Sequence, residues 1–499
     1  MYAAGRISTS SGARGGSRRL SSSARGAAER LALVRDPLRV ALFILTVLTI
    51  SRVHQHYPIL EKFRPALLLF LASVVYAYLN PRYLTRTNVF GVWPTRITAM
   101  LGVWSCLTAA FGISLGASAI FILSTYVKVL VYGVLIAVSI RHVRDLFTFV
   151  WAYVISCGIL AYFSIFVFGI SKSTNSYVSR LSNLYTYDSN DLCVVMLVGL
   201  PLMLLLLTIE RGAKRGLLML ILVGTAATIA RSGSRGGFIG FIAVAAAALL
   251  LVNGVSAGKR VVVLLVTLVA LGVAAPPGYW EQMQTIMTPK QDYNYYDRDG
   301  RKAVMERGLG YMSSYPVFGL GIDNFSRAEC TISPKISPAY TGGPLRCTAP
   351  HNSYVEAGAE MGLPGLLMWA SLVVGLVVAP LRLRRRLPRS LLRGTPAERF
   401  IYGATTYFPL AAIGFAVSSF FVSFAWMDPV YFLAAILTGL YVATRAEFSS
   451  GTGVPAHPVA EKALPGWRVR YSAWRAGMRA ESASSLPGLM PVAPPQHSS

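Results

Sequence analysis

The sequence predicts an all-α polytopic membrane protein with about twelve transmembrane helices and one large polar loop, residues 277–360, outside the cytoplasm. Hydrophobic residues make up 54% and charged residues 14% of the 499 positions, and the mean hydropathy is +0.52, well above that of an ordinary soluble domain. Apolar runs of about 17 to 24 residues recur along the chain, and about 20 residues of helix cross the hydrocarbon of a bilayer. Backbone groups in lipid must bond within their own segment, so these runs are predicted to be helices.

The basic residues set the expected topology. The predicted spans are 38–54, 64–80, 97–115, 118–140, 146–170, 190–209, 216–231, 236–253, 260–276, 361–380, 401–421 and 429–444. Arginine and lysine concentrate in alternate connections between these spans, as the positive-inside rule predicts for cytoplasmic loops. Both termini are therefore expected in the cytoplasm, and the outer connections are 171–189, 231–236, 277–360 and 422–428.

The two ends of the chain are predicted to be disordered cytoplasmic tails, at 1–37 and 445–499, around a transmembrane domain at 38–444. The formal net charge is +26, which in a soluble protein would suggest nucleic acid. Here the charge lies in the tails and in alternate loops, so we interpret it as topology and expect no nucleic-acid partner. The basic N-terminal tail, which lacks the early apolar core of a signal peptide, is expected to contact anionic membrane lipids.

A short polar turn with two arginines, Arg231 and Arg235, lies between two apolar runs on the predicted outer side. The positive-inside rule disfavours arginine there, and Gly236 and Gly237 permit close approach of a ligand to the start of the next helix. The turn is therefore a candidate anion site. The alternative is an ordinary turn whose arginines extend to lipid phosphates.

The long outer loop contains a second candidate cation, Arg301. It begins a stretch with Met305, Leu309 and Met312 at helical spacing, which predicts an amphipathic helix along the membrane surface. The alternative for Arg301 is a solvated surface charge. Two cysteines of the loop, Cys330 and Cys347, are expected to form a disulfide, because disulfides persist outside the cytoplasm.

A histidine, His351, stands where the loop returns to the membrane. It precedes Asn352, and Glu360 lies further along the helix predicted to follow. A single histidine is most often structural, but a side chain of this type at the membrane surface is suited to take a proton from a hydroxyl group. Asn190 and Asp191, which open the span 190–209 on the outer side, are further candidates for substrate binding.

These features, taken together, resemble the O-antigen ligase and O-antigen polymerase family over about residues 185–375. The positions that carry the resemblance are Asn190, Asp191 and Leu192, then Ser234 to Gly237, Arg301, Pro316, Gly319 to Gly321, His351, Asn352, Glu360 and Gly362. The resemblance implies a GT-C-type glycosyltransferase of the bacterial inner membrane with a periplasmic active site. It implies an undecaprenyl-diphosphate-linked glycan as donor, an acceptor sugar hydroxyl and no metal or other cofactor.

The resemblance also implies residue roles. Arg235 and Arg301 are expected to bind the diphosphate, and His351 to be the general base or an orienting residue. Asn352 and Glu360 are expected to hold the loop helix beside the substrate. Arg231 does not fall on the family pattern and remains a candidate substrate-binding residue. A flippase and a chain-length regulator are the protein partners that the resemblance suggests.

Several alternatives remain open. The acceptor is either a second lipid-linked glycan, in a polymerase of O-antigen or exopolysaccharide, or the lipid A core, in a ligase, and we favour the polymerase on frequency alone. A solute transporter is another possibility, because twelve helices with both ends inside is a common carrier layout and Lys128 lies within a predicted span. Carriers, however, place substrate groups near the membrane midplane. A scaffolding protein that acts through its basic tails is the third.

Overall fold

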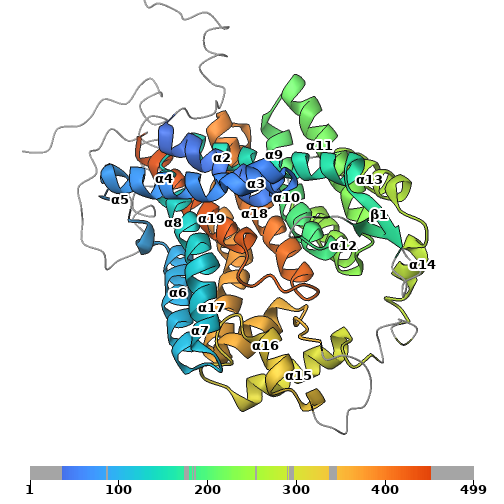
Figure 1. Ribbon diagram of the computed structural model, residues 1–499. Coiled ribbons are helices and arrows are strands. Elements are labelled where there is room, and N and C mark those ends of the chain that lie inside the picture. Colours follow the sequence, from blue (N-terminus) through green and yellow to red (C-terminus); the bar gives the residue numbers. More distant parts are fainter. Residues whose placement is uncertain are drawn as a thin grey trace, which may run out of the picture.

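The computed structural model describes residues 36–450, apart from short gaps at 86–87, 173–178, 183, 185–186, 253–255, 289, 291–296 and 337–345. The predicted tails therefore lie almost entirely outside the described residues. Within them the fold is helical, with one two-stranded antiparallel sheet in which Gly169 pairs with Ser182. Figure 1 shows the helices as one bundle with a loop region at one end.

The first half of the bundle runs from α2 to α11. Its helices are α2 (Pro37–Ser51), α3 (Pro58–Phe63), α4 (Pro65–Leu79), α5 (Arg82–Thr85), α6 (Trp93–Phe111), α7 (Leu115–Phe121), α8 (Val127–Ser139), α9 (Val143–Phe166), α10 (Ser189–Ile209) and α11 (Ala213–Arg231). A π-helical turn, Ile122–Tyr126, joins α7 to α8, short 3-10 turns lie at Val53–His56 and Val89–Gly91, and the strands are β1 (Gly169–Lys172) and β2 (Ser179–Ser182).

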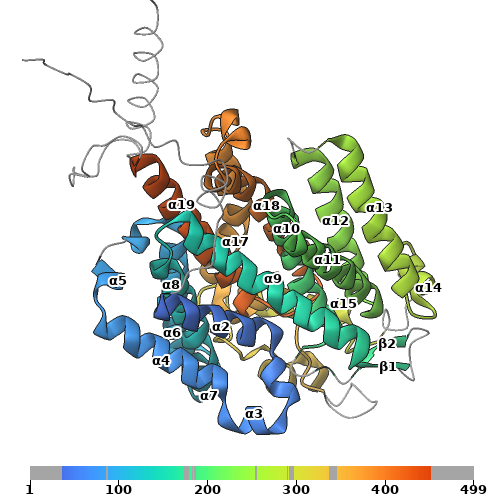
Figure 2. The same cartoon turned by 90° about the horizontal axis from the view of Figure 1, so that it is seen from above.

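The second half contains the outer loop. Its helices are α12 (Arg235–Leu251), α13 (Ala257–Ala274), α14 (Tyr279–Gln284), α15 (Arg301–Ser314), α16 (Phe325–Thr331), α17 (Ser353–Arg384), α18 (Pro396–Ser418) and α19 (Asp428–Ser450), with 3-10 turns at Pro334–Ile336 and Arg389–Arg393. Figure 2 shows α12 and α13 side by side at the edge of the bundle opposite α4 and α5.

Seven helices of the described chain are long and apolar enough to cross a membrane. They are Leu115–Ser139, Val143–Phe166, Ser189–Ile209, Ala213–Arg231, Ser353–Arg384, Pro396–Ser418 and Asp428–Phe448, and two shorter apolar helices are Pro37–Ser51 and Arg235–Leu251. The prediction of an all-α polytopic membrane protein is confirmed. Each of the twelve predicted spans overlaps a helix, but the count of twelve membrane crossings stays a prediction.

Helix α10 lies at the centre of the bundle, where it packs against α18, α12, α11 and α9. Asp188 caps its first turn, accepting hydrogen bonds from the N–H groups of Asn190 (2.6 Å) and Asp191 (2.8 Å). In return Asp191 accepts one from the N–H of Asp188 at 3.1 Å. This reciprocal cap fixes the outer end of α10.

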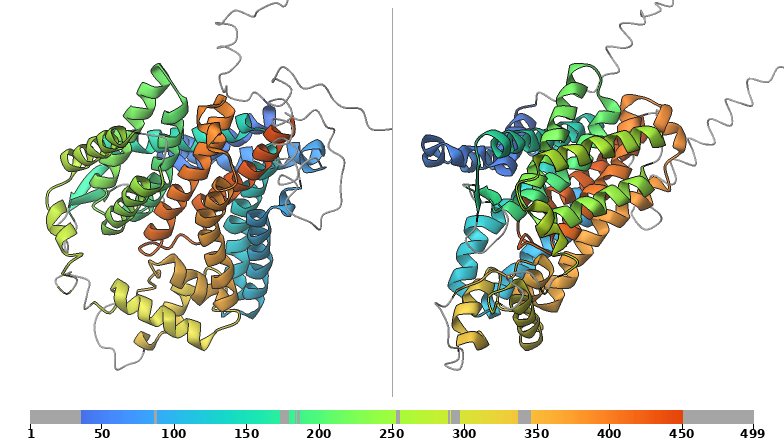
Figure 3. Two further views of the ribbon diagram at one scale, coloured as in Figure 1. Left: turned by 180° about the vertical axis from the view of Figure 1, so that it is seen from behind. Right: turned by 90° about the vertical axis from the view of Figure 1, so that its right-hand side faces the viewer.

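The helices of the outer loop lie beside one end of α17 (Figures 1 and 3), and they have a small hydrophobic core of their own. Its members are Val304, Tyr311, Leu320, Phe325, Ala328, Val355 and Ala359. Helix α15 forms where the sequence predicts, but the face that packs inward carries Val304, Gly308 and Tyr311. Of the predicted apolar stripe, Met312 packs against this core, whereas Met305 and Leu309 are 37% and 52% exposed.

Helix α17 is interrupted where the loop contacts the bundle. Gly362 has a φ of +67°, which breaks the helical hydrogen bonding. Backbone of the loop replaces the missing partners: the N–H of Leu363 donates to the carbonyl of Pro316, and the N–H of Leu320 donates to the carbonyl of Ala359, each at 2.8 Å. The segment 316–321 therefore completes the backbone of a membrane helix, which lipid could not do.

Candidate functional site

A cavity of about 310 Å³ lies between α12, the outer loop and the segment that follows α18. The polar residues that line it are Arg235, Thr285, Arg301, Lys302, His351 and Asn352, and the apolar ones are Ile239, Ile286, Met305, Pro350, Phe420 and Phe421. Three cations thus surround a space with no carboxylate among its described lining residues. A site of this composition favours an anion that carries an apolar group.

Arg235 reaches the cavity because α12 begins unusually close to its neighbours. The hydroxyl of Ser234 accepts a hydrogen bond from the N–H of Gly237 at 3.0 Å and so caps the helix. A Cβ atom at Gly236 would lie 2.5 Å from the Cβ of Phe421, and only glycine permits this approach. The guanidinium of Arg235 donates to the hydroxyl of Thr285 at 2.9 Å.

Asn190 and Asp191 lie behind this turn and do not line the cavity. The Asn190 side-chain oxygen accepts a hydrogen bond from Ser234 at 2.7 Å, and its amide donates to Asp188 at 3.3 Å. Asp191 takes part in the cap of α10. In the structure both residues contact other protein groups that hold the start of α12 against the start of α10.

His351 lines the cavity from a strained position. Its φ of +48° is rare for a residue with a side chain, and its N–H donates to the hydroxyl of Ser423 at 2.9 Å. The side-chain oxygen of Asn352 caps α17 by accepting from the N–H groups of Tyr354 (2.9 Å) and Val355 (3.1 Å). Strain of this kind is kept where surrounding contacts hold it, often at functional sites.

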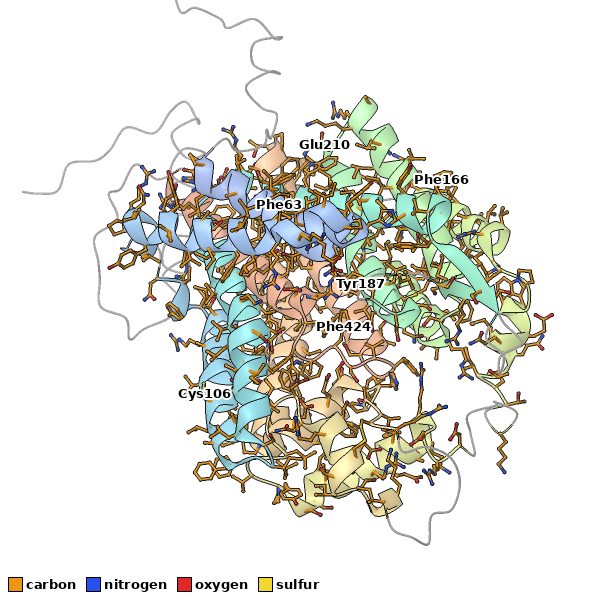
Figure 4. The ribbon with its side chains drawn as sticks, in the orientation of Figure 1. Phe63, Cys106, Phe166, Tyr187, Glu210 and Phe424 are labelled. Atoms are coloured by element: carbon orange, nitrogen blue, oxygen red, sulfur yellow. A yellow bond between two sulfur atoms is a disulfide. The ribbon has the colours of Figure 1, made fainter. Side chains whose placement is uncertain are left out.

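Burial, and then the positive charge of Arg301, lower the pKa of His351 below its ordinary value, and the charge of Asp188 acts in the opposite direction. The neutral imidazole is therefore favoured, and only the neutral form can accept a proton. Asp188 lies at the start of α10, next to Tyr187. The Tyr187 ring lies 6.4 Å from that of Phe424, next to Ser423, and Figure 4 labels this aromatic pair.

Two further predicted site residues, Arg231 and Glu360, also lie away from the cavity. Arg231 donates to the carbonyl of Ser164 at 2.9 Å, in the last turn of α9, and it is not among the residues that line the cavity. Such a contact satisfies a free carbonyl at a helix end. The two arginines of the turn thus point to different neighbours, since one ends α11 and the other begins α12.

Glu360 is buried away from the cavity, and its carboxylate accepts three hydrogen bonds from the protein. It accepts from the N–H of Asp323 (2.8 Å), the N–H of Phe325 (3.1 Å) and the indole of Trp426 (2.8 Å). These contacts hold the start of α16 against α17. They support the expected role of Glu360 in holding the loop and give no direct contact with the cavity.

Thr285 and Lys302 were not among the sequence candidates. Thr285 follows α14 in an irregular segment with no motif, so no signal identifies it. Lys302 follows Arg301 directly, and its exposed ammonium lies 3.9 Å from Glu306. Its position directly after Arg301 is the sequence feature from which Lys302 could have been predicted as a site residue.

The structure joins Cys330 to Cys347 by a disulfide, the pairing expected from their shared place in the outer loop. Among the described residues no group of three or more histidine, cysteine, aspartate or glutamate side chains is placed to hold a metal ion. Independence from metal stays a prediction.

The fold and this cavity define a polytopic helical membrane protein whose polar site gathers cations and a histidine beside apolar side chains. Residues 217–370 match the model of the O-antigen ligase family. This segment contains Arg235, Arg301, His351 and Asn352, and the match supports the resemblance to the O-antigen ligase and polymerase family. A comparison with curated proteins finds no match.

Proposed function

We propose that the protein is a membrane glycosyltransferase that moves a glycan from undecaprenyl diphosphate to the hydroxyl of an acceptor sugar. The proposal includes a site on the periplasmic face of the bacterial inner membrane, both termini in the cytoplasm, a GT-C-type fold and no metal. The observation that carries it is the cavity shared by Arg235, Arg301 and His351. The family match supports the same reaction class.

The charges of the cavity suit the leaving group. When the bond between the sugar C1 and the diphosphate oxygen breaks, negative charge accumulates on the diphosphate. Arg235 and Arg301 offer forked donors for it, and Lys302 adds a third positive charge at the rim. Ile239, Ile286 and Phe421 provide an apolar wall for the first isoprene units of the carrier.

The histidine suits the acceptor. The acceptor hydroxyl oxygen attacks C1 as the C1–O bond to the diphosphate breaks, and the hydroxyl proton passes to His351. A neutral imidazole with a lowered pKa is ready to accept it. Asn352 fixes the helix that follows, so His351 is presented from a rigid support.

The test is transfer by the purified protein with an undecaprenyl-diphosphate-linked glycan. Wild type should release undecaprenyl diphosphate and extend the acceptor, and His351→Ala and Arg301→Ala should each lower the rate at least 100-fold while still inserting in the membrane. Unchanged rates in both variants would refute the assignment of the site.

The acceptor is decided by a deletion strain. Loss of long chains with single repeats retained indicates a polymerase, which would act beside a flippase and a chain-length regulator. Complete chains left on the lipid carrier indicate a ligase for the lipid A core.

A solute transporter is the competing class. Uptake of a solute by vesicles, with normal surface glycan in the deletion strain, would favour it over transfer. The break in α17 does not form an open binding site for a carrier, because loop backbone satisfies it.

A further inference from the structure

We propose that Glu329 is a positioning residue: it is the centre of a buried ion cluster that holds the helix of Arg301 and the segment of His351 at a fixed separation. The inference rests on the proposed function, since it concerns how those two residues reach one site. The cluster consists of Glu329, Arg307, Lys335, Asp299, Tyr311 and Thr348.

The first set of contacts fixes α15. The Glu329 side chain is completely buried. The Arg307 Nε lies 2.9 Å and 3.1 Å from its two carboxylate oxygens, and the hydroxyl of Tyr311 donates to it at 2.9 Å. Arg307 and Tyr311 lie on the helix that Arg301 begins. Glu329 therefore sets where the first turn of that helix lies.

The second set fixes the approach to His351. The hydroxyl of Thr348 donates to Glu329 at 2.9 Å. The ammonium of Lys335 lies 3.0 Å from the same carboxylate and donates to the carbonyl of Arg346 at 2.6 Å. Thr348 stands three residues before His351, so little chain separates the cluster from the strained backbone at the cavity.

The third set fixes the chain that enters α15. Lys335 donates to Asp299 at 2.9 Å, and Arg307 donates to the carbonyl of Arg298 at 2.8 Å. Two cations thus balance two carboxylates in a buried place, and neither charge is left unpaired. Although burial alone would raise it, the hydrogen bonds from Arg307 and Lys335 lower the pKa of Glu329, so the carboxylate stays ionised.

The disulfide joins the same two segments next to the cluster, since Cys330 follows Glu329 and Cys347 precedes Thr348. It holds the segments together, and the hydrogen bonds to Arg307 and Tyr311 of α15 come from Glu329. Among the described residues, the carboxylate of Glu329 accepts hydrogen bonds from both Arg307 and Thr348. Loss of Glu329 should therefore displace Arg301 even while the disulfide keeps the loop closed, and this displacement can be tested separately from loop stability.

The experiment compares Glu329→Gln with Glu281→Gln, which removes an exposed carboxylate of the same outer region. Glu329→Gln should lower kcat/KM at least 10-fold. It should also move the acid limb of the pH–rate profile to higher pH, because His351 loses burial and the nearby charge of Arg301. Asp188 and Arg235 lie on other elements and keep their places, whereas Lys302 moves with Arg301 on α15 and its displacement shifts the limb in the same direction. Glu281→Gln should leave both the rate and the limb unchanged.

A second pair of variants tests the same proposal in case Glu329→Gln does not fold. Thr348→Val removes one hydroxyl at constant volume, and Thr348→Ser retains it. Hydrogen–deuterium exchange of a peptide covering 346–356 should be faster in Glu329→Gln and Thr348→Val and restored in Thr348→Ser. Unchanged exchange and an unchanged acid limb in folded Thr348→Val would overturn the proposal. If His351→Ala and Arg301→Ala retain transfer, the proposed function fails instead, and the exchange data still judge the positioning.

Discussion

Arg235 donates a hydrogen bond of 2.9 Å to the hydroxyl of Thr285, and this hydroxyl donates in turn to the carbonyl of Gln282 at 2.7 Å. The contact joins two parts of the chain that are 50 residues apart. It connects a turn between membrane helices to the outer loop at the atoms that face the cavity. The loop thus shapes the site from the Arg235 side as well as from the His351 side.

Substitution of the two arginines of the turn should have different effects on the rate of transfer. Arg235→Ala should lower transfer about 100-fold or more, because it removes a charged donor from the leaving group, and Arg235→Lys should recover only part of the rate. Arg231→Ala should leave kcat and KM near wild type and reduce only thermal stability, since Arg231 contacts Ser164. The transfer rates are measured per amount of folded protein, and stability is measured by thermal unfolding. A large kinetic loss in Arg231→Ala would contradict this placement.

Thr285 should matter through its hydroxyl alone. Thr285→Val keeps the volume and removes this one hydrogen bond to the Arg235 guanidinium, and a hydrogen bond to a charged group contributes about 1.5–3 kcal/mol. We expect kcat/KM for the lipid-linked donor to fall about tenfold, and Thr285→Ser to restore it. Equal rates in the valine and serine variants would show that the contact is incidental.

The pH dependence of transfer should report His351. Because its pKa is lowered, activity should persist as pH falls below the ordinary histidine value of about 6.5 and decline only when the imidazole is protonated. Asp188→Asn removes the charge that raises this pKa while keeping a good helix cap. Its acid limb should therefore lie at still lower pH. A shift to higher pH in Asp188→Asn would contradict the assignment of the limb to His351.

Two glycines of α15 should respond in opposite ways to alanine. A Cβ at Gly308 would collide with the side chain of Val355, whereas none of the described atoms lies within 4 Å of a Cβ at Gly310. Gly308→Ala should cost about 1–3 kcal/mol of loop stability through overpacking. Gly310→Ala should stabilise the helix by up to about 1 kcal/mol. Thermal unfolding in detergent measures both, and equal melting temperatures would show that the loop does not pack on α17 as described.

The disulfide should support the loop without being required for its fold. Cys330 and Cys347 are 17 residues apart, and closing a loop of that size contributes about 3 kcal/mol. Cys330→Ser with Cys347→Ser should make the loop more sensitive to protease yet retain measurable transfer, because the Glu329 cluster joins the same segments. Complete loss of transfer in the folded double variant would show that the cluster alone cannot hold the site.

The sequence was sufficient to predict the helices and several residues of the cavity. Apolar runs of membrane length leave few alternatives to helix, so each predicted span overlaps a helix of the structure. Arg235, Arg301, His351 and Asn352 line one cavity because they lie at helix ends that face the same side. Their positions could be inferred from Gly-rich and Pro-bounded turns.

The remaining features depend on tertiary contacts that no spacing shows. Arg231 and Arg235 are four residues apart in one turn, and which of them enters the cavity depends on whether it ends one helix or begins the next. Thr285 lies in irregular backbone, where a local pattern carries no information. Glu329 finds its partners about 20 residues away on either side, in a loop whose path is fixed only by its packing on α17.

The break at Gly362 limits which parts of this chain can be exchanged with those of another protein. Residues 316–321 complete part of the backbone hydrogen bonding of α17, so the loop and the helix can be exchanged only together. A loop transplanted from a relative would lack carbonyl partners matched to this break, and a helix transplanted without its loop would carry exposed amides into lipid. Chimeras that exchange 300–376 as a whole should insert and fold, whereas exchanges that end at the membrane surface should not.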